Sequence, residues 1–139
     1  MTPEQIAIVE STIRRARAEL VGLAAEFYDR LFEAEPQLHD LFTTDPAEQR
    51  QKFADQLDAI ARAIRDCDTF TADAAALGHR HRTYGVRARD YALAGPPLLE
   101  ALASVLGQEW TSDVEVAWLR AYNLTVEAMM AGTDQHLER

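Results

Sequence analysis

The fold of this chain is decided by residues 77–86, which read Leu77-Gly78-His79-Arg80-His81-Arg82-Thr83-Tyr84-Gly85-Val86. The stretch predicts the end of a helix, because glycine, here Gly85, is the residue at which a chain most readily leaves a helix. Side chains two positions apart on a helix point about 200° apart, since each residue turns by roughly 100°. His79 and His81 therefore cannot face one pocket or bind one metal ion. One of them faces inward, and its surroundings decide what the protein does.

Length and composition indicate one globular domain. The chain has 139 residues, enough for a single core, and its 47% apolar and 27% charged residues are typical of a soluble protein. A net charge of −9 argues against nucleic acid or an anionic membrane as a partner. We find neither an apolar run long enough to span a membrane nor a signal peptide. Cys67 is the only cysteine, which excludes an internal disulfide and favours a cytoplasmic location.

Helical periodicity covers almost the whole chain. Thr2 can cap a first helix and form a capping box with Gln5. We expect further helical segments at residues 20–34, 36–41, 46–64, 72–84, 90–106 and 113–131. Alternating β patterns, repeats and low-complexity segments are absent from the sequence. The prediction is an all-α domain of six or seven helices, joined by short corners.

Several helix ends are predicted from single residues. Residues 66–70 are expected to form a loop before the helix that carries the histidines. Pro96 and Pro97 predict a kink or a late start in the next helix, because proline removes a hydrogen bond. Ser112 can open a capping box for the last helix, and Gly132 is expected to end that helix.

Each residue that could carry chemistry also has an ordinary explanation. A lone helical histidine is usually solvated or hydrogen-bonded within the protein. Tyr28 lies among apolar residues and is typical of a core tyrosine, whereas Gln49 belongs to a polar, solvated segment. The sequence holds no Cys-His metal spacing, glycine-rich phosphate loop or Ser/His/Asp signature. Single motifs therefore predict no more than an all-α domain.

The combination of segments resembles the globin domain of flavohaemoglobins and of bacterial single-domain haemoglobins. The resemblance covers nearly the whole chain, as a single globin domain over residues 1–139, and implies a globin fold around a haem pocket. It rests on residues 27–32, 36–38 and 42 (B and C helices and CD corner), 49 and 53 (E helix), 77–86 (F helix), 90–91, 98–102, 106–111 and 117–122 (G and H helices).

The resemblance implies a role for five side chains around haem b. His81 is assigned as the proximal iron ligand, which turns the other histidine of the pair toward solvent. Tyr28 is placed over the iron with Gln49 near it, either as a second hydrogen-bond donor or as a support for the tyrosine. Phe42 is expected to pack against the haem face, and Phe53 to restrict ligand access.

The proximal side matches the family only in part. Tyr91 matches a tyrosine that hydrogen-bonds near the proximal histidine in the family. The glutamate that accompanies it there is not matched: Asp134 lies just beyond its expected place and Glu127 further back. We also expect Gly78 to leave room near the porphyrin plane.

The resemblance implies reversible binding of dioxygen and other diatomic gases, nitric oxide and carbon monoxide among them. It also allows nitric oxide dioxygenase activity supported by a separate flavin reductase, because the sequence stops at Arg139 without flavin and nicotinamide domains. The alternatives are gas sensing, storage or delivery without turnover, and a haem-free globin-like domain that binds other proteins. The chain is expected to be a monomer or a homodimer.

Overall fold

The computed structural model describes residues 1–137, and side chains up to residue 131. Six α-helices account for most of it, in the order α1 (Pro3–Ala16), α2 (Leu20–Ala34), α3 (Pro46–Ala63), α4 (Cys67–Thr83), α5 (Ala88–Leu106) and α6 (Ser112–Leu137). Short 3-10 turns cover Arg17–Glu19, Pro36–Leu41 and Gly107–Glu109. Residues 1–137 contain no strand, which confirms the all-α prediction.

Side-chain caps set where the helices begin. Thr2 and Gln5 form the predicted reciprocal capping box, with N–H···O distances of 3.0 and 3.1 Å. Asp45 caps α3 through the backbone N–H groups of the next turn. The predicted loop at residues 66–70 is wrong, because Asp66 accepts a hydrogen bond from the Thr69 N–H at 3.2 Å and starts α4 at the following residue.

Three further helix ends differ from the prediction. α5 begins early and runs unbroken through Pro96 and Pro97, and the Asp90 carboxylate fixes its start by accepting the Arg87 N–H at 2.8 Å. The cap of α6 lies one residue earlier than predicted: the Thr111 hydroxyl accepts the Val114 N–H at 3.3 Å. α6 then continues past residue 132 to its end at Leu137.

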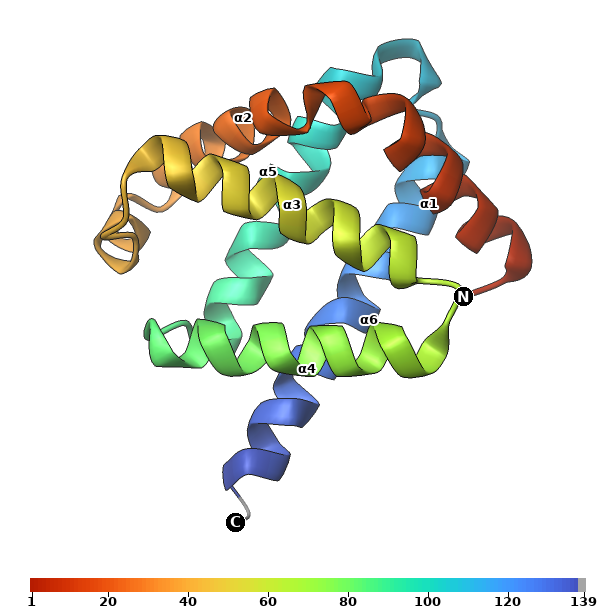
Figure 1. Cartoon of the computed structure of the whole chain (residues 1–139). Coiled ribbons are helices and arrows are strands. Elements are labelled where there is room, and N and C mark those ends of the chain that lie inside the picture. Colours follow the sequence, from red (N-terminus) through yellow and green to blue (C-terminus); the bar gives the residue numbers. More distant parts are fainter. Residues whose placement is uncertain (138–139) are drawn as a thin grey trace.

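The helices are arranged in crossing pairs. α3 and α4 run antiparallel across the front of Figure 1, and α5 and α6 cross behind them. α4 meets α6 where Gly78 lies against Met129: a Cβ at residue 78 would lie 2.7 Å from the Met129 Cα and closer still to its carbonyl oxygen. Gly78 therefore allows two helix backbones to touch. The expectation that Gly78 makes room for a flat ring is wrong, since its empty side faces α6.

The core joins the N-terminal helices to α5 and α6. Its largest fully enclosed apolar side chains are Val9, Ile13, Leu23 and Leu102. A buried hydrogen bond of 2.8 Å from the Trp118 indole to the Thr12 hydroxyl ties α6 to α1. Among the residues that the structure describes, no helix has both the length and the apolar character needed to cross a membrane.

Candidate functional site

A cavity of about 480 Å³ lies between α2, α3, α4, α5 and α6. Its lining is mostly apolar and rich in aromatic rings, namely Phe27, Tyr28, Phe42, Phe53, Tyr84, Tyr91, Trp118 and Tyr122. This size and this lining are typical of a site for a small organic ligand or cofactor. The six side chains singled out in the sequence all line it: Tyr28, Phe42, Gln49, Phe53, His81 and Tyr91.

The two histidines of α4 point to different sides of the helix, and His81 is the one that lines the cavity. Of the described residues that line the cavity, His81 is the one histidine, whereas His79 is exposed on the outer side of α4. The hydrogen bonds at the end of α4 fix which of its side chains face the cavity. The Val86 N–H donates to the His81 carbonyl at 3.1 Å, and Gly85 adopts φ +90°. Together these features end the helix in a Schellman motif.

The hydrogen bond of the His81 ring defines its tautomer. Nδ1 lies 2.9 Å from the Leu77 carbonyl oxygen, one turn earlier on α4. A carbonyl can only accept, so Nδ1 carries the proton and Nε2 holds a lone pair directed away from the helix. Burial lowers the pKa of His81, and this effect outweighs the Leu77 carbonyl, which raises it. The imidazole is therefore neutral near pH 7, as a metal ligand must be.

A tyrosine and a glutamine meet on the other side of the cavity. The Gln49 Nε2 on α3 donates a hydrogen bond of 3.0 Å to the Tyr28 hydroxyl on α2. Because the phenol oxygen accepts this bond, its own hydrogen can point into the cavity. Burial raises the pKa of Tyr28, with the Gln49 bond opposing in part, so the phenol stays protonated. This contact is the geometry expected of a Gln49 that supports the tyrosine, and the second Nε2 hydrogen stays available as a further donor.

Aromatic rings fix the orientation of Tyr28. Phe42 and Phe53 both meet its ring edge-on, with centroids at 5.2 and 5.6 Å. Phe53 also stacks on Phe27 at 4.6 Å. Such pairs add stability beyond the area that they bury and leave the phenol little freedom to turn.

Tyr91 lies beside His81 without sharing its proton. The two rings are 6.2 Å apart and 29° from parallel, while the single Nδ1 proton is committed to Leu77. The Tyr91 carbonyl accepts a hydrogen bond from the buried Tyr122 hydroxyl, which binds α5 to α6 behind the histidine. Tyr122 also lines the cavity. The Asp134 side chain lies outside the described residues.

Polar residues surround the cavity mouth. Lys52 and Arg80 are exposed and line the cavity, and Arg80 bonds Gln56 at 3.3 Å across the space between α4 and α3. Sequence reasoning missed these three. The spacing of Gln56 held the signal, since it lies three residues after Phe53 and seven after Gln49 and so shares their face of α3.

The structure is an all-helical domain in which a neutral histidine and a tyrosine–glutamine pair line one apolar cavity. Sequence comparison identifies the family to which this domain belongs. The globin family model matches residues 25–129. The chain therefore belongs to the globin family.

Curated relatives support the same family. The chain is 30% identical to the flavohemoprotein of Bacillus subtilis over 128 residues, covering 90% of this chain and 32% of that protein. It is 29% identical to the flavohemoprotein of Rhizobium meliloti over 133 residues, covering 94% of this chain and 33% of that protein. The chain thus spans about one third of the length of these relatives.

Solved structures confirm the globin fold. An engineered carbene transferase from Rhodothermus marinus, assigned as a nitric oxide dioxygenase, superposes with a TM-score of 0.89 at 26% identity, covering 99% of this chain and 96% of that one. A bacterial globin from Campylobacter jejuni superposes with a TM-score of 0.88 at 21% identity, covering 99% of this chain and 100% of that one. At the lower identity the likeness concerns the fold alone.

The residues present fit the haem that this family implies. The cavity offers an apolar, aromatic-lined space, and the free Nε2 of His81 faces it. Lys52 and Arg80 stand at the exposed mouth, where two carboxylates of an otherwise apolar ring would need cations. The donor set, one neutral imidazole, is one that can hold a haem iron.

Proposed function

We propose that this chain binds haem b through His81 and reversibly binds dioxygen and other diatomic gases, including nitric oxide and carbon monoxide, on the side of Tyr28. The observation that carries the proposal is the opposition of two neutral groups across one apolar cavity. The His81 lone pair lies on one side, and the Tyr28 hydroxyl, supported by Gln49, on the other.

When bound, haem supplies an iron with one open coordination position for a gas and the means to exchange one electron. The protein residues do the rest. His81 would hold the haem iron through Nε2, and the Leu77 carbonyl keeps the ring in one tautomer. Tyr28 directs an O–H donor at the gas on the other side. Phe42 and Phe53 keep that side dry and narrow.

Replacement of each histidine tests the proposal. His81→Ala is expected to abolish the Soret band of the protein expressed with haem supply, or to lose its five-coordinate ferrous spectrum, because the axial ligand is gone. The matched control His79→Ala removes an exposed ring two residues away and should leave both spectra unchanged. A wild-type protein without a Soret band would contradict haem binding and favour the haem-free interaction domain. Damage by His79→Ala alone would contradict the register of α4.

Nitric oxide turnover is a second candidate, favoured by the likeness to the Rhodothermus marinus protein. In this function the chain would convert nitric oxide and dioxygen to nitrate, with electrons from a separate flavin reductase. The assay is consumption of nitric oxide under air with a generic flavin reductase and NADH. Sustained consumption above the reductase alone supports turnover. A single stoichiometric phase supports storage, delivery or sensing.

A further inference from the structure

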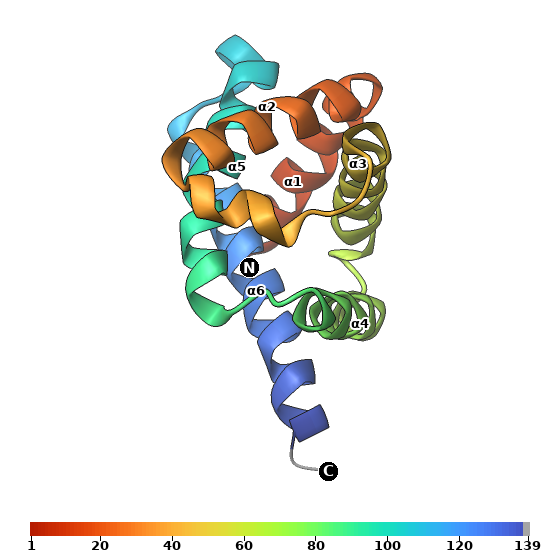
Figure 2. The same ribbon diagram turned by 90° about the vertical axis from the view of Figure 1, so that its left-hand side faces the viewer.

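The positive charge of this acidic chain is concentrated beside the cavity mouth. Residues 74–89 contain four of its fourteen arginine and lysine residues and none of its 23 aspartate and glutamate residues, although the net charge is −9. We call these four the arginine rim: Arg80, Arg82, Arg87 and Arg89. They lie on the last turn of α4 and the first turn of α5, which face the viewer in Figure 2.

Local structure explains only half of the arginine rim. Arg80 and Arg82 end α4, where a helix dipole favours cations. Arg87 and Arg89 begin α5, where the same dipole disfavours cations. The Asp90 carboxylate forms a long ion pair of 3.9 Å with the Arg89 Nε and leaves Arg87 without a compensating ion pair among the described residues. The Arg89 side chain remains 73% exposed.

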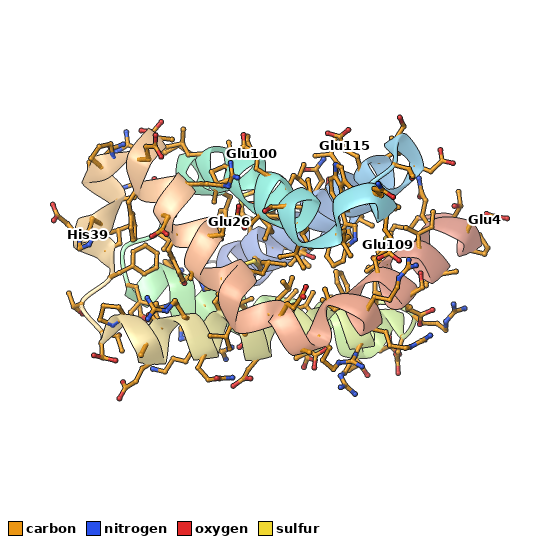
Figure 3. All side chains as sticks on the ribbon, turned by 90° about the horizontal axis from the view of Figure 1, so that it is seen from above. Glu4, Glu26, His39, Glu100, Glu109 and Glu115 are labelled. Atoms are coloured by element: carbon orange, nitrogen blue, oxygen red, sulfur yellow. The ribbon has the colours of Figure 1, made fainter. Side chains whose placement is uncertain are left out.

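Haem carboxylates do not explain the rest of the rim either. Arg80 lines the cavity, whereas the other three arginines stand outside its lining and face outward or along the surface. Acidic groups dominate elsewhere. Figure 3 looks down on the molecule from above the view of Figure 1, onto α1, α2 and the corner between α5 and α6, where Glu26, Glu100, Glu109 and Glu115 lie. Arg15 and Arg30 pair with Glu109, Glu26 and Glu100 on this face. Outside residues 74–89, however, the chain carries 23 acidic and 10 basic residues, so an acidic partner is repelled by the rest of the chain and attracted at the rim.

We propose that the arginine rim is the docking surface for an acidic electron-carrier protein that reduces the haem iron. This inference rests on the proposed function, because the cofactor edge must reach the mouth between Arg80 and Lys52. One electron leaves the reduced carrier, which is oxidised, and ferric iron becomes ferrous. No covalent bond forms or breaks, and no proton has to move. Charge complementarity fixes the orientation: this face alone brings an acidic carrier to the mouth.

The test is the rate at which reduced flavodoxin, an acidic one-electron carrier, converts the ferric holoprotein to its ferrous carbon monoxide complex in stopped flow. The variant is Arg87→Glu with Arg89→Glu, which leaves the cavity lining intact. Both glutamates would stand where the α5 dipole favours acids, which offsets the loss of the 3.9 Å ion pair between Arg89 and Asp90. The control variant carries Arg14→Glu and Arg62→Glu together. These two substitutions, on α1 and α3, change the net charge by the same amount as the rim variant does.

We expect the rim variant to react about tenfold more slowly at 10 mM salt, and the control variant by less than about twofold. The difference should vanish near 1 M salt, where screening reduces the range of charges to about 3 Å. Equal slowing of both variants, or a loss that persists in 1 M salt, would overturn the docking surface. Dithionite separates the two proposals. A holoprotein that dithionite cannot bring to the carbon monoxide complex contradicts the proposed function itself.

Discussion

The two sides of the cavity are held in different ways. His81 is oriented by a carbonyl of its own helix, four residues back, and by the glycine that ends that helix. Tyr28 is oriented by Gln49, which comes from another helix and lies 21 residues away. The histidine side is therefore set by local geometry once α4 forms. The tyrosine side exists only after α2 and α3 have packed together.

The two sides share one electrostatic property. Burial lowers the pKa of His81 and raises the pKa of Tyr28, so the same apolar surroundings keep both groups neutral. An uncharged imidazole offers a lone pair, and an uncharged phenol offers a hydrogen. The comparison shows how one dry cavity makes an electron-pair donor on one wall and a hydrogen-bond donor on the other.

The largest expected effect is a loss of stability at the contact between α6 and α4, the helix that carries His81. Gly78→Ala should lower the free energy of unfolding by about 3 kcal/mol, because the new methyl group would overlap the Met129 backbone and push α4 from α6. Chemical denaturation of the wild type and the variant measures it. Haem should also dissociate faster, since His81 moves with α4.

Gly22→Ala is the matched control for that change. Nothing lies within 4 Å of a Cβ at residue 22, which is exposed on α2. Alanine should there stabilise the protein by about 0.5–1 kcal/mol through helix propensity. Similar results for the two substitutions would show that α4 and α6 do not touch at Gly78.

The next largest effect is on the dissociation rate of dioxygen, and it distinguishes the role of Tyr28 from that of Gln49. Tyr28→Phe should speed the dissociation of dioxygen roughly tenfold to hundredfold, since a hydrogen bond to a charged acceptor contributes about 1.5–3 kcal/mol. Gln49→Leu should speed it only about threefold to tenfold, because it removes a neutral bond of about 1 kcal/mol and leaves the phenol in place. Flash photolysis or stopped flow measures both rates. An unchanged rate in Tyr28→Phe would remove Tyr28 from contact with the gas, and a larger effect of Gln49→Leu would reverse the two roles.

The smallest effect concerns pH and the neutral histidine. The pKa of His81 in the folded chain lies below its ordinary value of 6.5, so the unfolded chain binds the proton more readily. The stability that neutral His81 contributes is thus complete above pH 6.5 and is lost as the pH falls through 6.5 toward the folded value. Urea denaturation of the haem-free chain from pH 8 to pH 5 measures it. His81→Gln should lose less stability than the wild type over this range, and parallel curves would contradict the burial of His81.

Sequence reasoning succeeded where a residue acts within its own helix. The capping box of Thr2 and Gln5, the end of α4 at Gly85 and the opposite directions of His79 and His81 follow from helical geometry. The predicted start of α4 at residue 72 was wrong, since Asp66 caps the helix and α4 begins at Cys67. The start of α6 differed by one residue, because the Thr111 hydroxyl caps it in place of Ser112. The role of Gly78 was misjudged, since the sequence does not show which helix crosses at that residue.

The sequence by itself determined that the chain is all-α and that one histidine of residues 77–86 faces inward, because the turn per residue is fixed by the backbone. Family resemblance selected His81. The tertiary structure alone decided that Gln49 supports Tyr28, that Gly78 belongs to the contact with α6, and that Arg80 meets Gln56 at the cavity mouth. Such contacts join residues far apart in the chain. Their geometry depends on how whole helices pack, which no local pattern specifies.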